Sequence, residues 1–153
     1  MSNVSPIPAG YHAVTPYLLM NNAAAAMEFY KQALGATELY RLAMPDGIVA
    51  HAEMMIGDSH IMLADAKMAA LGGAPDPSGK GSVSFMVYVP NVDEAFATAL
   101  AAGATELRAV ADQFYGDRTG TFRDPFGHTW SLGTHIKDVS PEEMQKLMES
   151  MGG

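Results

Sequence analysis

Gly35-Ala36-Thr37-Glu38-Leu39 is repeated without change at Gly103-Ala104-Thr105-Glu106-Leu107. Each copy follows a stretch with helix-like apolar periodicity, residues 22–34 in the first case and 91–102 in the second, and each stretch follows a strand-like run. The repeat therefore indicates that one βαβ-like unit occurs twice in the chain. A duplicated small unit of this kind is expected to enclose a cavity between its copies.

Turn signals complete the order βαβββ in each half. Pro45-Asp46-Gly47 and Gly57-Asp58 separate strands in the first half, and Asp124-Pro125-Phe126-Gly127 separates the last two strands of the second. Strands are predicted at residues 14–20, 38–44, 48–56, 60–64, 83–89, 105–111, 119–123 and 129–134. We expect an α+β fold of two tandem βαβββ modules that form a curved sheet around a cavity, plus a C-terminal helix. The predicted boundaries are 12–71 for the first module, 72–81 for a linker, 82–136 for the second module and 137–153 for a helical tail.

The composition narrows the classes of partner. The net charge of the 153 residues is −8, so neither nucleic acid nor an anionic membrane surface is expected as a partner. The sequence has no cysteine, which excludes disulfides and thiol nucleophiles. It also lacks a signal-like N-terminus and any apolar run of bilayer length, and we therefore expect a cytoplasmic protein.

The tail carries its own helix signal. Ser140-Pro141-Glu142-Glu143 is typical of a capping box with proline at the first helical position. An apolar stripe follows at Met144, Leu147, Met148 and Met151. Such a short helix is marginal alone, so the stripe is expected to dock either on its own sheet or on a second subunit of a homodimer.

Several motifs support a resemblance to a known superfamily. Glu28-Phe29-Tyr30 lies in the first helix ahead of Leu34-Gly35-Ala36, and Asp124-Pro125-Phe126-Gly127 precedes the last strand. With the two βαβββ halves, this resembles the vicinal oxygen chelate superfamily of glyoxalase I, extradiol dioxygenases and bleomycin-resistance proteins. His51-Ala52-Glu53 and Gly116-Asp117-Arg118 resemble its PhnB-like branch.

The resemblance also places the divalent-metal site of the metal-using members. Its four ligand positions correspond to Thr15, Met62, Ser84 and Ser131 in this sequence. Three hydroxyls and a thioether provide no fixed negative charge and little donor strength, whereas divalent ions prefer carboxylates, carbonyls and imidazoles. We therefore expect that the site is lost and that no metal cofactor is needed.

A rearranged metal site remains the alternative. His60 shares a face with Met62, and His51 and Glu53 share a face two residues apart on another strand. Imidazoles and a carboxylate would suit Zn, Mn, Fe or Ni. His51 and Glu53 can equally form a hydrogen-bonded pair with a purely structural role.

Strand alternation predicts which side chains face the cavity. The ligand-binding candidates on strands are Thr15, Tyr17, His60, Met62, Ser84, Met86, Tyr88 and Ser131. A mostly apolar concavity with a few polar groups is typical of a small-molecule site, although the same residues could simply pack as a core. The loop 113–118 is a candidate lid in which Tyr115 stacks on a planar ligand and Arg118 binds an anion, unless Arg118 instead pairs with Asp117.

Three functions are compatible with these features. The first is small-molecule binding without a metal, with sequestration by bleomycin-resistance proteins as the analogy. The second is a metal-dependent lyase, isomerase or dioxygenase, and the third is an interaction role for the tail helix. Whether any reaction is catalysed, and by which residues, is left open, as is pairing of the modules within one chain or by exchange between two.

Overall fold

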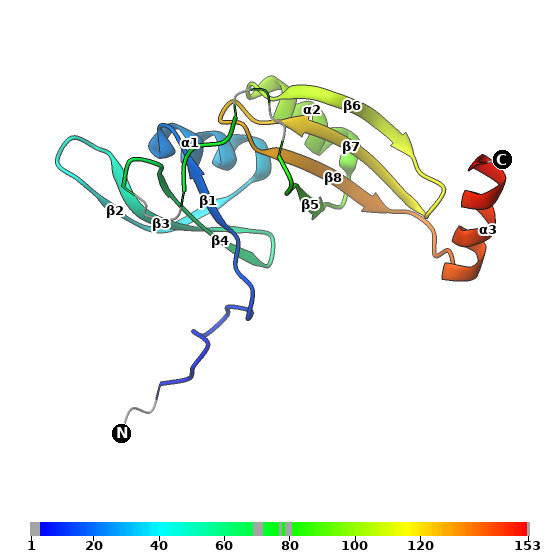
Figure 1. The fold of residues 1–153 in the computed structure, drawn as a ribbon, viewed down its shortest axis with the longest axis horizontal. Coiled ribbons are helices and arrows are strands. Elements are labelled where there is room, and N and C mark those ends of the chain that lie inside the picture. Colours follow the sequence, from blue (N-terminus) through cyan, green and yellow to red (C-terminus); the bar gives the residue numbers. More distant parts are fainter. Residues whose placement is uncertain (1–3, 69–71, 77, 79–80, 153) are drawn as a thin grey trace. The chain divides into compact units, whose positions relative to one another are not determined.

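The structure is a computed structural model that describes residues 4–68, 72–76, 78 and 81–152. The chain divides into two compact units, Met1–Lys80 and Gly81–Gly153. Parts of the predicted linker (77, 79 and 80), the last residues of the predicted first module (69–71) and residue 153 of the tail lie outside the described residues. Figure 1 shows that each unit contains one sheet and one helix that packs on it.

The first unit has the order βαβββ. It contains β1 (Tyr17–Met20), α1 (Ala23–Leu34), β2 (Thr37–Ala43), β3 (Val49–Ile56) and β4 (Ser59–Asp65). The sheet order is β1-β4-β3-β2, with β1 parallel to β4 and the other pairs antiparallel.

The second unit repeats this plan. It contains β5 (Phe85–Tyr88), α2 (Val92–Ala101), β6 (Thr105–Asp112), β7 (Asp117–Arg123) and β8 (Thr129–His135), in the sheet order β5-β8-β7-β6. A third helix, α3 (Pro141–Gly152), follows. The predicted α+β class with two tandem modules and a C-terminal helix is confirmed (Figure 1).

The strand register confirms the internal duplication. Tyr17 pairs with Met62 between β1 and β4, and Met86 pairs with Ser131 between β5 and β8. Met86 follows Tyr17, and Ser131 follows Met62, by the same 69 residues. The predicted equivalence of positions in the two halves therefore holds in three dimensions.

The helix ends follow from local chemistry. The Asn22 side chain accepts a hydrogen bond from Ala25 N at 3.2 Å, and Gly35 ends α1 with a left-handed φ of 63°. Asn91 caps α2 in the same way through Glu94 N. Ser140 caps α3 through Glu143 N at 3.2 Å, which confirms the N-cap half of the predicted capping box.

One face of each sheet forms a core with its helix. In the first unit, alternate residues such as Leu18, Met54 and Leu63 are fully buried, as is Tyr30 of α1. In the second unit, Phe122 of β7 lies 6.2 Å from Phe96 of α2, ring centroid to centroid. The buried Trp130 belongs to the same face of the second sheet.

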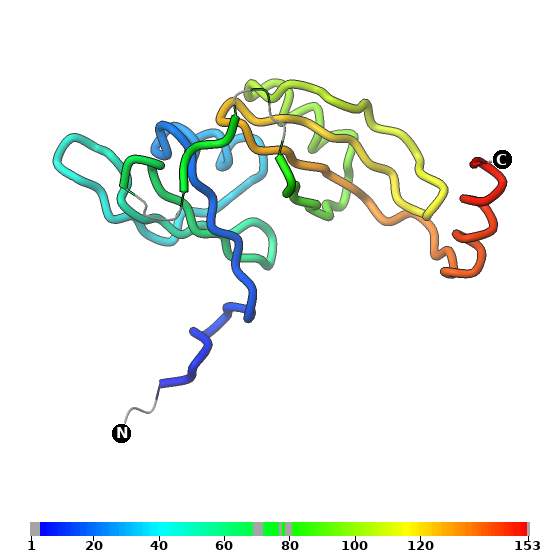
Figure 2. Tube along the Cα trace, viewed as in Figure 1, coloured from blue at the N-terminus to red at the C-terminus, as the bar shows by residue number. Residues whose placement is uncertain are grey.

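Most strand ends differ from the sequence prediction by one or two residues, and the largest difference is at the start of β1. β1 begins at Tyr17 and not at residue 14, because Pro16 has no N–H to donate and contributes only its carbonyl, which accepts from Met62 N at 2.9 Å. Residues 4–16 form an irregular arm that leads into the strand (Figure 2). None of the helices in the described ranges has the length and apolar character that crossing a membrane requires.

Candidate functional site

The face of the first sheet that α1 does not cover carries a set of polar side chains. The register places Glu53 of β3 beside Tyr40 of β2 on one side and Met62 of β4 on the other, and Met62 beside Tyr17 of β1. His51 lies two residues before Glu53 and so shares this face. Strand alternation thus gathers side chains from all four strands.

Glu53 is the centre of this set, because its carboxylate is hydrogen-bonded on both oxygens. Tyr11 from the N-terminal arm donates to Oε1, and Tyr40 donates to Oε2. The Nε2 atom of His51 lies 2.8 Å from Oε2, and the hydroxyl of Tyr17 lies 2.8 Å from His51 Nδ1. Glu53 is only 6% exposed, a burial that a carboxylate tolerates when its oxygens are bonded in this way.

These contacts define how protons are held. A His51 tautomer with its proton on Nε2 would donate to Glu53 and would leave Nδ1 to accept from the Tyr17 hydroxyl. Burial and, secondly, the neighbouring Tyr40 raise the pKa of Tyr17 above its usual value. At neutral pH Tyr17 therefore keeps its proton. Hydrogen-bond donors and acceptors then lie together on this face of the first sheet.

His60 lies next to this set but is not bonded to it. Its ring stacks on Tyr11 with centroids 3.8 Å apart, and its Nδ1 atom is buried without a hydrogen-bond partner. Over the described ranges, no three His, Asp or Glu side chains are placed so that they could hold a metal ion. The alternative metal site would place His60, His51 and Glu53 around one ion. In the structure the His60 ring faces Tyr11.

The four positions that the resemblance gives for a metal site carry weak donors. Met62 offers a thioether, and the Ser131 hydroxyl forms a 2.8 Å hydrogen bond with the Thr121 hydroxyl. Thr15 precedes β1 and Ser84 precedes β5, each offering one hydroxyl. This donor set lacks the carboxylates and imidazoles that hard and borderline cations require.

The open face of the second sheet carries a different network around Asp117. The Tyr88 hydroxyl donates to Asp117 Oδ2 at 2.7 Å, and His135 Nδ1 lies 2.7 Å from Asp117 Oδ1. His135 Nε2 lies 2.7 Å from Asp138. Burial alone would raise the pKa of Asp117, but the hydrogen bonds from His135 and Tyr88 hold it below its usual value. Asp138 and, secondly, Asp117 raise the pKa of His135.

Arg118 forms ion pairs with two aspartates other than Asp117. Its guanidinium bonds Asp93 at 2.9 and 3.0 Å and Asp112 at 2.9 Å, so the alternative pairing with Asp117 is wrong. Both carboxylates are exposed, and the predicted contact of Arg118 with a ligand anion stays a prediction.

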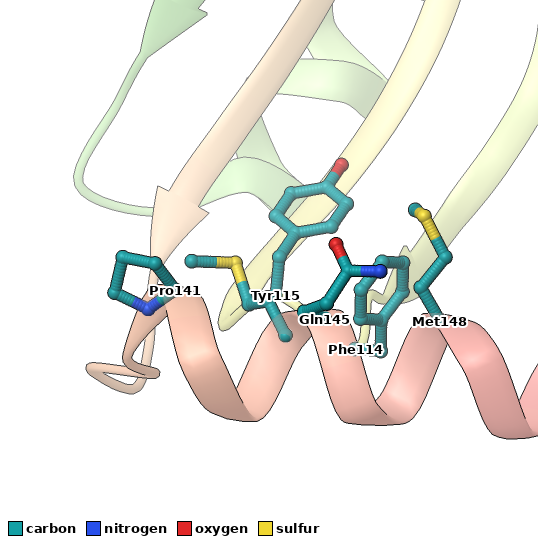
Figure 3. A pocket seen from close by; sticks show the side chains of 6 residues that line it. Phe114, Tyr115, Pro141, Gln145 and Met148 are labelled. Carbon is teal, nitrogen blue, oxygen red and sulfur yellow. The ribbon is translucent and has the colours of Figure 1, made fainter.

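Tyr115 lines a pocket at the C-terminal helix. The pocket has a volume of about 400 Å³, within the usual range of small-molecule sites, and its other lining residues are Phe114, Pro141, Met144, Gln145 and Met148. Figure 3 shows the Gln145 amide between the rings of Tyr115 and Phe114. Tyr115 thus lies against α3 within the second unit.

The sequence identified part of this site. Tyr17, His51 and Glu53 were predicted on strand parity and are joined by hydrogen bonds, with Met62 beside them. Tyr11 and Tyr40 were missed. Tyr11 lies in an irregular arm without periodicity, and the β2–β3 register is irregular between Glu38 and Tyr40, so strand counting could not place Tyr40 opposite Glu53.

Comparison with known proteins agrees with this architecture. An uncharacterised protein of Mycobacterium bovis is 41% identical over 143 residues, covering 92% of this chain and 94% of the relative. The crystal structure of an Arabidopsis thaliana gene product superimposes with a TM-score of 0.66 at 26% identity, over 80% of this chain and 98% of that one. The PhnB protein from Bacillus cereus shares the fold with a TM-score of 0.63 at 19% identity, over 80% and 99% of the two chains.

The family model matches most of the described chain. It covers residues 11–132, which include the sheets and helices of both units up to β8. The duplicated βαβββ units, their common register and this match agree. The chain belongs to the Glyoxalase/Bleomycin resistance protein/Dioxygenase superfamily.

Proposed function

We propose that this protein binds a small organic molecule at the network around Glu53, without a metal ion. The observation that carries the proposal is the convergence of three side chains on one nearly buried carboxylate, on the sheet face that α1 does not cover. Tyr17 and Tyr40 remain 37% and 43% exposed, so they offer a ligand both ring surface and hydroxyls. Small-molecule sites usually orient their ligand with a few polar groups set among apolar and aromatic side chains.

Packing alone does not account for this network. The core of the first unit lies on the opposite face of the sheet, where Leu18, Met54 and Leu63 are buried. Burying a carboxylate costs free energy that its hydrogen bonds only offset. A role in recognition supplies a reason for the arrangement, and sequestration of a compound, as in bleomycin-resistance proteins, is the analogous activity.

Metal analysis tests the metal-free part of the proposal. Protein purified without chelator is analysed for Zn, Mn, Fe and Ni, and we expect far less than one ion per chain. A stoichiometric ion that is lost on His60→Ala and retained on His12→Ala would contradict the proposal. That result would favour the alternative lyase, isomerase or dioxygenase with His51, Glu53 and His60 as ligands.

A ligand screen tests the binding part. Compounds that co-purify with the protein are released by denaturation and identified by mass spectrometry, and a library is screened by thermal shift. A ligand at a hundred times its Kd stabilises the folded state by about 2.7 kcal/mol. We expect the shift to be lost in Glu53→Gln and kept in Glu142→Gln, a matched change of an exposed carboxylate in α3. Equal shifts in both variants would place the ligand elsewhere.

The proposal includes a homodimer that buries the apolar stripe of α3. None of the α3 residues described is buried, and Leu147, Met148 and Met151 are 37%, 54% and 60% exposed. We expect that truncation after Val139, or Met148→Glu, converts a dimer to a monomer in light scattering coupled to size exclusion. An unchanged mass would remove this part of the proposal, and a lost dimer with no ligand found would favour the interaction role. The cytoplasmic location stays a prediction.

A further inference from the structure

Tyr11 occupies the network around Glu53 in the manner of a bound ligand. Its hydroxyl donates to Glu53 Oε1, and its ring stacks on His60 at 3.8 Å with an interplanar angle of 23°. The preceding Gly10 lies over the same ring, since a Cβ placed there would be 3.6 Å from His60 Cε1. Tyr11 thus contacts Glu53 through its hydroxyl and His60 through its ring.

The residues on both sides of Tyr11 in the arm are exposed. Residues 4–10 are all exposed, residues 12–14 are exposed as well, and Tyr11 between them is partly buried. Its backbone makes a local turn, with Tyr11 N donating to Pro8 O at 3.0 Å. Tyr11 is therefore a partly buried residue within an exposed stretch of the arm.

The groups beneath Tyr11 would remain in place without it. Glu53 keeps its bonds to Tyr40 and His51, and these also hold the carboxylate near its present position. Oε1 of Glu53 would then be free to accept a hydrogen bond, and the face of His60 would be free to stack. His60 Nδ1, which has no partner, could bond a further polar substituent.

We propose that the site binds small phenols, or planar aromatic molecules with an equivalent hydrogen-bond donor, in place of the Tyr11 side chain. This inference rests on the proposed function and names its ligand class. Such a ligand would donate its hydroxyl to Glu53 and stack on His60, as Tyr11 does now. Because Tyr11 is tethered, it competes at high effective concentration and weakens the apparent affinity for a free ligand.

The test uses 4-methylphenol, which has the structure of the tyrosine side chain, and toluene as the matched probe without a hydroxyl. Binding to the full chain is measured by calorimetry and by NMR of the His60 ring. If Tyr11 fills the site in about nine molecules of ten, Tyr11→Ala should tighten 4-methylphenol binding about tenfold. Tyr11→Phe, which keeps the ring and loses the donor, should give a smaller gain. His12→Ala, an exposed neighbour in the arm, should leave the affinity at the wild-type value.

Two further results identify the contacts. Toluene should bind Tyr11→Ala more weakly than 4-methylphenol, and Glu53→Gln in the Tyr11→Ala background should reduce that difference, because a neutral amide oxygen is a weaker acceptor than a carboxylate. Equal affinity of wild type and Tyr11→Ala for 4-methylphenol, or binding that leaves the His60 ring signals unchanged, would overturn the inference. If Tyr11→Ala does not bind 4-methylphenol while another compound binds in a Glu53-dependent way, the ligand class is wrong and the proposed function stands.

Discussion

Glu53 and Asp117 show two ways of placing a carboxylate on the open face of a sheet. Each is nearly buried, at 6% and 5% exposure, and each is bonded to tyrosine and histidine. Glu53 receives two tyrosine hydroxyls and a histidine that is itself bonded to a third tyrosine. Asp117 shares His135 with a second carboxylate, Asp138, so its network resembles an ion-pair cluster more than a ligand site.

The Asp117 network predicts a pH-dependent stability. The pKa of His135 is raised in the folded state. The contribution of this histidine to the free energy of unfolding is therefore fully present below about pH 6.5 and is lost as the pH rises through the raised pKa. The pKa of Asp117 is lowered in the folded state. The contribution of this aspartate to the free energy of unfolding is therefore present above the ordinary aspartate pKa and is lost as the pH falls through the lowered pKa. We expect His135→Gln to lower the free energy of unfolding more at about pH 6 than at about pH 9. A loss that is equal at both values, measured by denaturant unfolding, would show that His135 is not charged in this network.

Gly120 gives a prediction about packing between β7 and α2. A Cβ at this position would lie 2.8 Å from Val110 Cγ2 and 3.1 Å from Phe96 Cε2, so one of these side chains must move. We expect Gly120→Ala to lower the free energy of unfolding by about 1–3 kcal/mol, the usual cost of overpacking. Gly81→Ala, where a Cβ meets nothing within 4 Å, is the control and should change the stability little. Equal effects of the two substitutions would contradict this close approach.

At the scale of the elements, α1 depends on a carboxylate from the last strand of its own unit. Asp65 at the end of β4 accepts from Asn22 N at 3.1 Å and Ala23 N at 3.3 Å, next to the positive end of the helix dipole, and from Val49 N at 3.4 Å. Asp65→Ala leaves these buried donors without the carboxylate, and we expect a loss of about 2–3 kcal/mol in the free energy of unfolding. Asp58→Ala, in the exposed turn before β4, should cost less than about 0.5 kcal/mol. Denaturant unfolding of the two variants decides whether Asp65 holds the helix to the sheet.

The elements were largely predictable because their signals are local. Asn22, Gly35 and Asn91 cap helices through their own side chains or backbone angles, and strand parity placed Tyr17, His51 and Glu53 on one face. The rest depends on contacts between distant segments. Asp65 reaches α1 across more than forty residues, and Tyr11 reaches Glu53 across a similar separation, from an arm with no repeating pattern.

At the scale of the whole molecule, the duplication gives each unit its own core. Tyr30 and Leu63 belong to the buried set of the first unit, whereas Phe96, Phe122 and Trp130 belong to that of the second. Separate cores allow separate opening, since the free energy of local unfolding is set by the contacts that a segment makes. Gly120→Ala and Asp65→Ala change one core each and so form a pair of matched perturbations.

Amide hydrogen exchange on these two variants tests whether the units unfold independently. We expect Gly120→Ala to reduce protection in α2, β7 and β8 and to leave α1, β3 and β4 unchanged, with the reverse pattern for Asp65→Ala. The physical reason is that a substitution lowers the opening free energy only of the cooperative unit whose contacts it removes. Equal reductions in all six elements in both variants would mean that the duplicated halves unfold as one. In that case the loss of either core would expose the network around Glu53, and binding at that network would stabilise the whole chain and not the first unit alone.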